Sequence, residues 1–176
     1  LSADDVAGDH PIITELPQPR GTVTALALDA LLENLYVGTA DGQVVHVALS
    51  ETESPEMRAA YTVAASSTAV TTLGFLSGDR SLVVMSEDGA VSTWGLVRRA
   101  DAPSGWTLIQ IHTLRAHNAP VTAFAPSQRV KGFVTGDMKG NLFLHHATSS
   151  QTLLRLANSE FPIRAVAFAP KGDGLI

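Results

Sequence analysis

The chain has 176 residues, is 45% hydrophobic, and carries a net charge of −5 from 17 acidic and 12 basic residues. This length fits one domain with a sizeable core, and the acidic balance lacks the basic surface typical of nucleic-acid binding. Cysteine is absent, which excludes disulfides, thiolate zinc sites and cysteine nucleophiles.

No apolar run reaches the ~18 residues of a membrane helix. The N-terminal stretch also lacks the basic and apolar segments of a signal peptide. The chain does not start with methionine, and it stops just where a new strand should begin. We therefore expect it to be part of a longer protein.

Four similar segments recur along the chain and predict four equivalent strands, whose first residues are separated by 47, 51 and 42 positions. Because side chains alternate between the two faces of a strand, one face is mostly small and the other mostly large. Both faces are apolar, so small residues of one sheet should pack against large residues of the next. The segments are VTALAL (23–28), VTTLGF (70–75), VTAFAP (121–126) and IRAVAF (163–168), and their first residues Val23, Val70, Val121 and Ile163 are assigned to the small face.

Each of the first three segments is followed by two more predicted strands that a tight turn joins. The turn glycines Gly42, Gly89 and Gly140 are separated by 47 and 51 positions, which repeats the spacing of the first strands. Asp-Gly between alternating hydrophobic residues favours a primed hairpin turn, because glycine adopts positive φ at low cost. Two independent landmarks in one register indicate a true repeat.

A further strand is predicted around each of these units. Four short antiparallel strands every 40 to 50 residues are typical of the blades of a β-propeller, and a two-sheet sandwich is the alternative. The fourth strands are HPIITELP (10–17), AAYTVAA (59–65), WTLIQIHTL (106–114) and QTLLRLA (151–157).

Two motifs carry a resemblance to WD repeats. LRAHNAPVTAFAP (114–126) resembles the opening of a WD blade, and DGAVSTW (88–94) resembles its close. In that family a His, a Ser or Thr, the turn Asp and the Trp form a buried hydrogen-bond network, and no unit here has the full set. We therefore expect packing rather than this network to hold the blades. The departures are Val47 at the Trp position of the first unit, Ser66 at the His position of the second, and Lys139 and His145 at the Asp and Trp positions of the third.

The predicted fold class is therefore all-β, a partial WD-like propeller fragment with three to four blades of four antiparallel strands. We expect residues 1–176 to form one domain. Its blade units are predicted at about 20–66, 67–117 and 118–160, with the start of a further blade at 161–176 and the end of a preceding blade at 1–19.

Residues 73–155 resemble the large periplasmic insert of some bacterial phosphate ABC transporter permease subunits. The resemblance is carried by Trp94 to Arg99, by PSQRVKGF (126–133) and by HHATSSQTLL (145–154). It implies a non-catalytic, protein-interaction or regulatory domain in the periplasm. The parent would be an inner-membrane phosphate importer, and the partners would be its other subunits or the solute-binding protein. Membrane contact would come only from segments absent from this chain. The alternative is a fragment of a free-standing WD-like scaffold or adaptor.

Candidate binding chemistry is sparse. Arg98 and Arg99 could hold an oxyanion or a partner through paired donors, and the alternative is a solvated loop in which Asp101 partly neutralises them. Trp106 is predicted to pack on an outer strand, where a contact role stays open. The open edges of an incomplete ring should let the fragment form homodimers edge to edge.

The six histidines do not predict a metal site. His145 and His146 are adjacent on a strand and point to opposite faces, so they cannot readily chelate one ion. His117 is expected to bond locally where a strand begins, and the remaining three lack a partner at ligand spacing. Nucleotide-binding and nucleophile-elbow motifs are also missing. We expect no catalytic, cofactor or metal site, and therefore no enzyme. The remaining histidines are His10, His46 and His112.

Overall fold

A computed structural model describes residues 21–49, 57–78, 80–102, 105–114, 117–127, 129, 131–149 and 151–169. These residues form twelve strands and no helix. No helix in these ranges is therefore long and apolar enough to span a membrane. The predicted end of a preceding blade at 1–19, with His10, lies outside the described residues.

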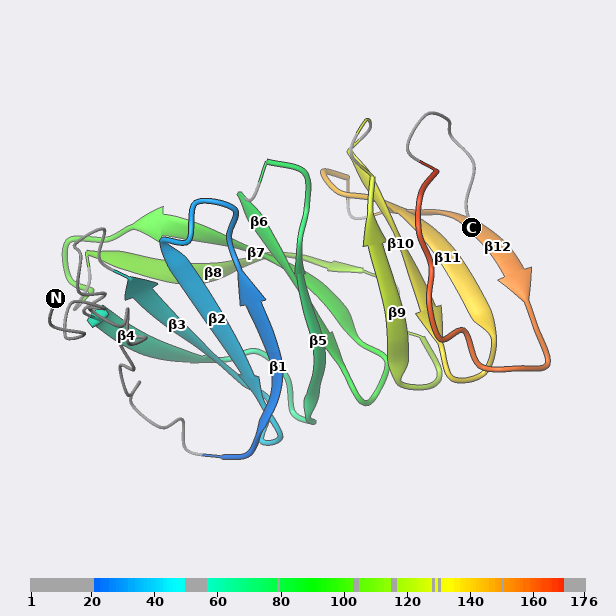
Figure 1. The fold of residues 1–176 in the computed structure, drawn as a ribbon, viewed down its shortest axis with the longest axis horizontal. Coiled ribbons are helices and arrows are strands. Elements are labelled where there is room, and N and C mark those ends of the chain that lie inside the picture. Colours follow the sequence, from blue (N-terminus) through cyan, green and yellow to red (C-terminus); the bar gives the residue numbers. More distant parts are fainter. Residues whose placement is uncertain are drawn as a thin grey trace, which may run out of the picture.

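The strands form three sheets of four, and neighbouring strands are antiparallel (Figure 1). This confirms the predicted fold class. In each sheet the strands lie in chain order, so every connection within a sheet is a hairpin. The first sheet contains β1 (Val23–Leu28), β2 (Asn34–Thr39), β3 (Gln43–Leu49) and β4 (Met57–Ala64); the second contains β5 (Val70–Phe75), β6 (Ser81–Ser86), β7 (Val91–Arg98) and β8 (Trp106–Leu114); the third contains β9 (Val121–Pro126), β10 (Gly132–Asp137), β11 (Asn141–His146) and β12 (Gln151–Asn158).

The glycines of the three equivalent turns are required for two reasons. Gly42, Gly89 and Gly140 have φ of 79°, 85° and 79°, which disfavours any residue with a Cβ. A Cβ at these positions would also lie 2.2, 2.4 and 2.1 Å from a backbone carbonyl oxygen of the segment leading to the next sheet. The predicted turns thus also set how closely each loop approaches the following unit.

The sheets pack face to face with small residues against large ones, as predicted. Ala25 and Ala27 of the first sheet pack against a cluster that includes Leu73 and Trp94 of the second. A Cβ on Gly74 would lie 2.4 Å from the ring of Phe124 in the third sheet. In both contacts, small residues on the first strand of one sheet face forward, toward the next sheet along the chain, and meet large residues that face backward from that sheet.

The first strand of each sheet (β1, β5 and β9) is called its inner strand below. The side chain of the first residue of each inner strand points to the face opposite to the predicted one. A register shift follows Val23 and Val70, and another lies where β9 begins at Val121. Such a bulge breaks the alternation of side chains. The side chain of Val70 therefore points backward, where it fills the space that a Cβ on Gly38 would occupy at 2.6 Å.

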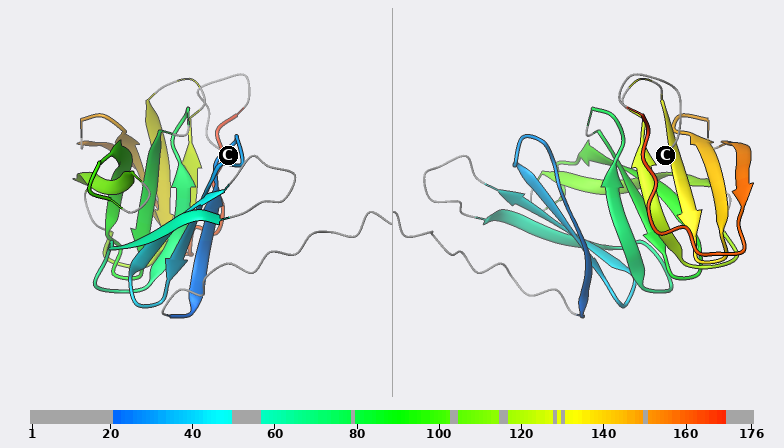
Figure 2. Two further views of the ribbon diagram at one scale, coloured as in Figure 1. Left: turned by 90° about the vertical axis from the view of Figure 1, so that its left-hand side faces the viewer. Right: turned by 45° about the vertical axis from the view of Figure 1, so that its right-hand side comes forward.

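A threonine hydrogen bond joins successive inner strands at equivalent positions. In each case the hydroxyl donates to the backbone carbonyl of the first residue of the next inner segment. Residues 163–168, which run beside β9 (Figures 1 and 2), take part in the same pattern, although only Phe168 among them forms a bridge. The fourth repeat thus occupies the place of a fourth inner strand. The bonds are Thr24 to Val70 (2.5 Å), Thr71 to Val121 (3.2 Å) and Thr122 to Ile163 (2.6 Å).

Candidate functional site

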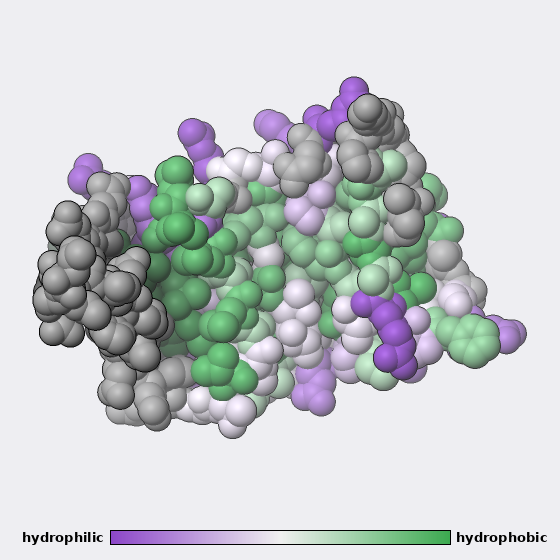
Figure 3. Space-filling view, in the orientation of Figure 1, coloured by the Kyte–Doolittle hydropathy of each residue, from purple (hydrophilic) through white to green (hydrophobic). Residues whose placement is uncertain are grey.

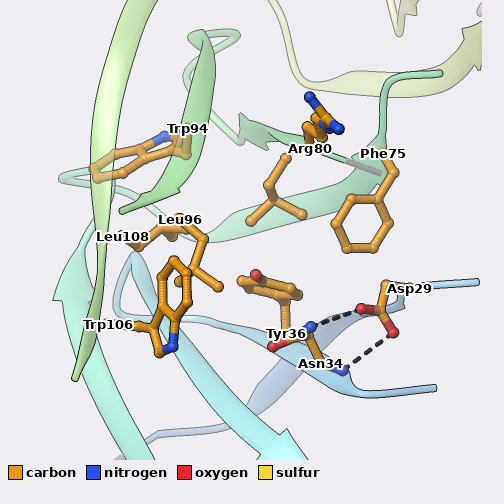
Figure 4. Close-up of a pocket in the computed structure, with 10 residues that line it drawn as sticks. Asp29, Asn34, Tyr36, Phe75, Arg80, Trp94, Leu96, Trp106 and Leu108 are labelled. Carbon is orange, nitrogen blue, oxygen red and sulfur yellow. Dashed lines mark hydrogen bonds between the residues drawn. The ribbon is translucent and has the colours of Figure 1, made fainter. Parts of the chain in front are cut away.

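A cavity of about 360 Å³ lies between the first and second sheets (Figure 4). One wall is formed by Trp94 and Trp106, and Phe75 lies on the opposite side, with Tyr36 between them. The turn after β1 and the loop before β6 contribute Asp29 and Arg80. The cavity is therefore lined mainly by aromatic and leucine side chains, with a few polar groups.

Packing fixes the aromatic rings. Tyr36 makes an edge contact with Phe75 at 5.5 Å between centroids and stacks on His46 at 4.8 Å. The Nε1 of Trp94 donates to Ser92 at 2.8 Å. In contrast, Trp106 is 40% exposed, so it is the aromatic side chain of this wall that a partner can reach.

The carboxylate of Asp29 is held by three donors from the turn. It accepts the backbone N–H of Glu33 at 2.8 Å and that of Asn34 at 3.1 Å, and the side-chain amide of Asn34 at 2.7 Å. Asn34 in turn accepts the Nε2–H of His46 at 2.8 Å. This chain of bonds fixes the polar side chains of Asp29 and Asn34 in the cavity before any ligand arrives.

Burial controls the charge of the groups beside Asp29. It lowers the pKa of His46 to about 4, against a smaller opposing effect of the Asp29 charge. Burial, followed by that same charge, raises the pKa of Tyr36 to about 12. At neutral pH the imidazole of His46 is therefore uncharged and the phenol of Tyr36 keeps its proton.

The two predicted arginines engage separate partners. The guanidinium of Arg98 lies over the ring of Trp106, 5.6 Å from its centroid, which places a cation beside the cavity. Arg99 pairs with Asp101 at 3.1 Å in a largely exposed loop. Arg98 therefore lies beside the cavity through its contact with Trp106, whereas Arg99 lies in an exposed loop where it pairs with Asp101.

The third sheet contains a buried polar network that was not predicted from the sequence. His117 Nδ1 lies 2.8 Å from Asp137, and its Nε2 lies 2.7 Å from the hydroxyl of Thr135. That hydroxyl lies 2.7 Å from His145 Nε2, and His145 Nδ1 lies 3.1 Å from Thr152. The prediction that packing rather than a polar network holds the blades is wrong for this sheet, and His117 bonds across the sheet rather than locally.

The network forms because other residues replace the turn Asp and the Trp of a WD blade, which this unit lacks. Asp137, two positions before Lys139, provides the carboxylate, and His145 takes the Trp position. With both imidazoles neutral, every hydrogen bond can be made: His117 donates to Asp137, the Thr135 hydroxyl donates to His117, and His145 donates to that hydroxyl. Burial lowers the pKa of both histidines, that of His145 to about 4, which favours these neutral forms.

Among the described residues of the second sheet no such network is present. Asp88 accepts the hydroxyl of Ser86 at 2.8 Å, and Trp94 donates to Ser92, so the turn carboxylate and the indole bond to different groups. His145 is fully buried, whereas His146 is only half-buried and bonds to Ser149 of the following turn at 3.1 Å. Among the described residues, no three histidine or carboxylate side chains are grouped to hold a metal ion.

The cavity was not predicted from the sequence. Its lining comes from the turn after β1, from β2, from the end of β5, from the loop before β6 and β6 itself, and from both strands of the β7–β8 hairpin, which are far apart in the chain. A usable signal was present, because Tyr36 and Trp94 lie on strands of consecutive predicted blades and must approach each other if those blades pack together.

No protein-family model matches the chain, and no curated protein matches it. Solved structures do match. The computationally designed protein Ika4 has a TM-score of 0.68 at 20% identity, over 92% of this chain and 93% of that one. The Cps50 (Swd1) β-propeller domain of Myceliophteria thermophila also has a TM-score of 0.68, at 17% identity, over 85% of this chain and 45% of that one. The chain has a WD-repeat-like β-propeller fold.

A chain of the Mitotic Checkpoint Complex matches with a TM-score of 0.68 at 23% identity, over 87% of this chain and 43% of that one. This propeller segment thus spans less than half the length of the last two proteins and nearly the whole of Ika4. At these identities the likeness concerns the fold.

Proposed function

We propose that this propeller segment is a non-catalytic protein-interaction module that binds a partner at the cavity between the first two sheets. The observation that supports the proposal is the exposed Trp106 at the cavity wall with Arg98 over its ring. Tryptophan and arginine are the residues that most often dominate binding energy at protein interfaces. A cavity of about 360 Å³ also lies within the range of ordinary ligand pockets.

The lining defines the chemistry of the bound segment. The aromatic wall favours an apolar or aromatic side chain, because its burial removes apolar surface from water. Arg98 and Arg80 add positive charge beside the cavity, whereas the Asp29 carboxylate is already satisfied by three donors. A partner segment with an apolar side chain next to an acidic one would therefore fit.

The resemblance of residues 73–155 to permease inserts supports a finer proposal. In it the segment is a periplasmic domain of a phosphate importer of the inner membrane, and the partner is another subunit or the solute-binding protein. Deletion of the domain from such a permease, followed by measurement of phosphate uptake, tests this setting. Reduced uptake is expected, and unchanged uptake contradicts a coupling role.

The second candidate is part of a free-standing WD-like scaffold or adaptor. It is supported by the similarity to propeller chains of which this segment covers 45% and 43%. The sequence on either side of the segment separates the two settings. Further blades favour the scaffold, and hydrophobic segments of membrane-spanning length favour the permease.

A peptide-display experiment tests the interaction site. A random peptide library is selected on the 176-residue chain, and the enriched peptides are measured by calorimetry against single variants. Trp106→Ala should weaken binding about tenfold or more, as expected for an interface anchor. Ile109→Ala, at a 42% exposed position on the same strand, is the matched control and should leave the affinity unchanged. Equal affinities for the two variants would contradict the proposal.

A further inference from the structure

One end of the row of sheets exposes a large apolar face. In the second sheet the equivalent face, which includes Leu73 and Phe75, packs against the first sheet. Hydrophobic colour accordingly gathers over β1 and the turn that follows it (Figure 3). The exposed side chains of this face are Val23 (46%), Leu26 (62%) and Leu28 (44%).

The other end exposes a small apolar face. Residues 163–168 are fixed against the third sheet, since Ile163 donates its N–H to the Asp137 carbonyl at 3.0 Å and packs against Gly136. Along this segment Val166 and Phe168 are half-buried, whereas Ala165 and Ala167 are exposed. Its small residues therefore lie on the side away from the third sheet.

These two end faces are the two halves of an interface that the chain already uses between its own sheets. Within the chain, Ala25 and Ala27 pack in the cluster that contains Leu73, and Gly74 lies against Phe124. In both cases small residues on the first strand of one sheet pack against large residues on the first strand of the next sheet. Ala165 and Ala167 repeat the alanines of β1, and Leu26 and Leu28 repeat the large residues that such alanines receive.

We propose that two copies of this chain associate head to tail, so that the β1 face of one packs on residues 163–168 of the other. The faces differ in side-chain size, so the contact is heterologous: each copy contributes a different surface. Two copies can make this contact twice, once at each end of the row of sheets. This contact lies outside the cavity of Trp106 and does not depend on partner binding there.

Sedimentation velocity on the 176-residue chain over a wide concentration range tests the proposal. The wild-type chain should form a dimer. The double variant Leu26→Ser/Leu28→Ser should be monomeric, and so should Ala165→Glu/Ala167→Glu, because each loses one of the two faces. The changed side chains are exposed, and circular dichroism verifies that both variants fold. Ile109→Ser, at an exposed apolar position away from both faces, should keep the dimer.

Mixing the two double variants gives the decisive result. Each variant retains the face that the other has lost, so an equimolar mixture should recover a heterodimer that neither forms alone. A contact that uses the same surface on both copies would not recover in this way. A wild-type chain that stays monomeric, a dimer that both double variants keep, or a mixture without heterodimer would overturn the proposal.

Discussion

Acidification should weaken the fold through His145 in the third sheet. Its side chain is fully buried and bonds to Thr135 and Thr152. Burial, with a smaller effect of nearby His117, lowers its pKa from 6.5 to about 4. The unfolded chain therefore takes up a proton at a higher pH than the folded chain does. The resulting stabilisation is complete above pH 6.5 and is lost as the pH falls toward 4.

The size of this effect follows from the shift. A pKa difference of one unit corresponds to about 1.4 kcal/mol, so His145 alone accounts for about 3 kcal/mol. His46 in the first sheet has its pKa lowered to about 4 as well, and it should add a similar amount. The carboxyl of Asp137 does not add to the loss of stability between pH 7 and 4.5. Burial raises the pKa of this carboxyl, but hydrogen bonds from Asn141 and His117 together outweigh that effect and hold the pKa below 3.8, so the stability that Asp137 contributes is lost only on further acidification.

Urea unfolding at a series of pH values between 7 and 4.5 measures the effect. The free energy of unfolding should decrease steadily below pH 6.5, and His145→Phe should reduce the slope because it removes one titrating group. His46→Phe is the matched variant in another sheet and should reduce the slope similarly. A free energy of unfolding that stays constant over this range, or a slope that His145→Phe leaves unchanged, would refute the reasoning.

Two further predictions concern stability at neutral pH. Gly89→Ala should destabilise the fold by several kcal/mol, because the new Cβ would lie 2.4 Å from the His117 carbonyl oxygen in addition to the φ strain. Gly78→Ala has a similar φ of 85° but nothing within 4 Å of the new Cβ, so it should cost only about 1 kcal/mol; equal losses in urea unfolding would contradict the packing of the turn. Trp94→Phe should cost about 2 kcal/mol, since it leaves Ser92 without the indole donor. A double-mutant cycle with Ser92→Ala should then show strong coupling, and additive effects would contradict the bond.

The repeat was predictable because its signals are local. Alternating apolar residues specify strands, and the glycines at 42, 89 and 140 specify turns that need positive φ. The orientation of the Val70 side chain was not predictable, because the bulge that turns it toward the first sheet depends on how β5 pairs with β6. Side-chain alternation within one strand does not contain that information.

The site was less predictable, since it depends on distances between segments far apart in the sequence. Asp137 replaces Lys139 in the network because a carboxylate two positions earlier can still reach His117 in three dimensions. The cavity needs two sheets to come together before Tyr36 and Trp106 share a lining. Arg98 was identified by its charge, but its place over Trp106 follows from the pairing of β7 with β8.

The central claim is that the first strands of successive sheets pack small residues against large ones in one repeated geometry. Nuclear Overhauser measurements on the isotope-labelled chain test it most directly. The account predicts close contacts from Val70 to Gly38, from Phe124 to Gly74 and from Ile163 to Gly136, each of which joins two consecutive units. Finding these pairs far apart, or finding only one of them in contact, would contradict the repeated packing and with it the propeller.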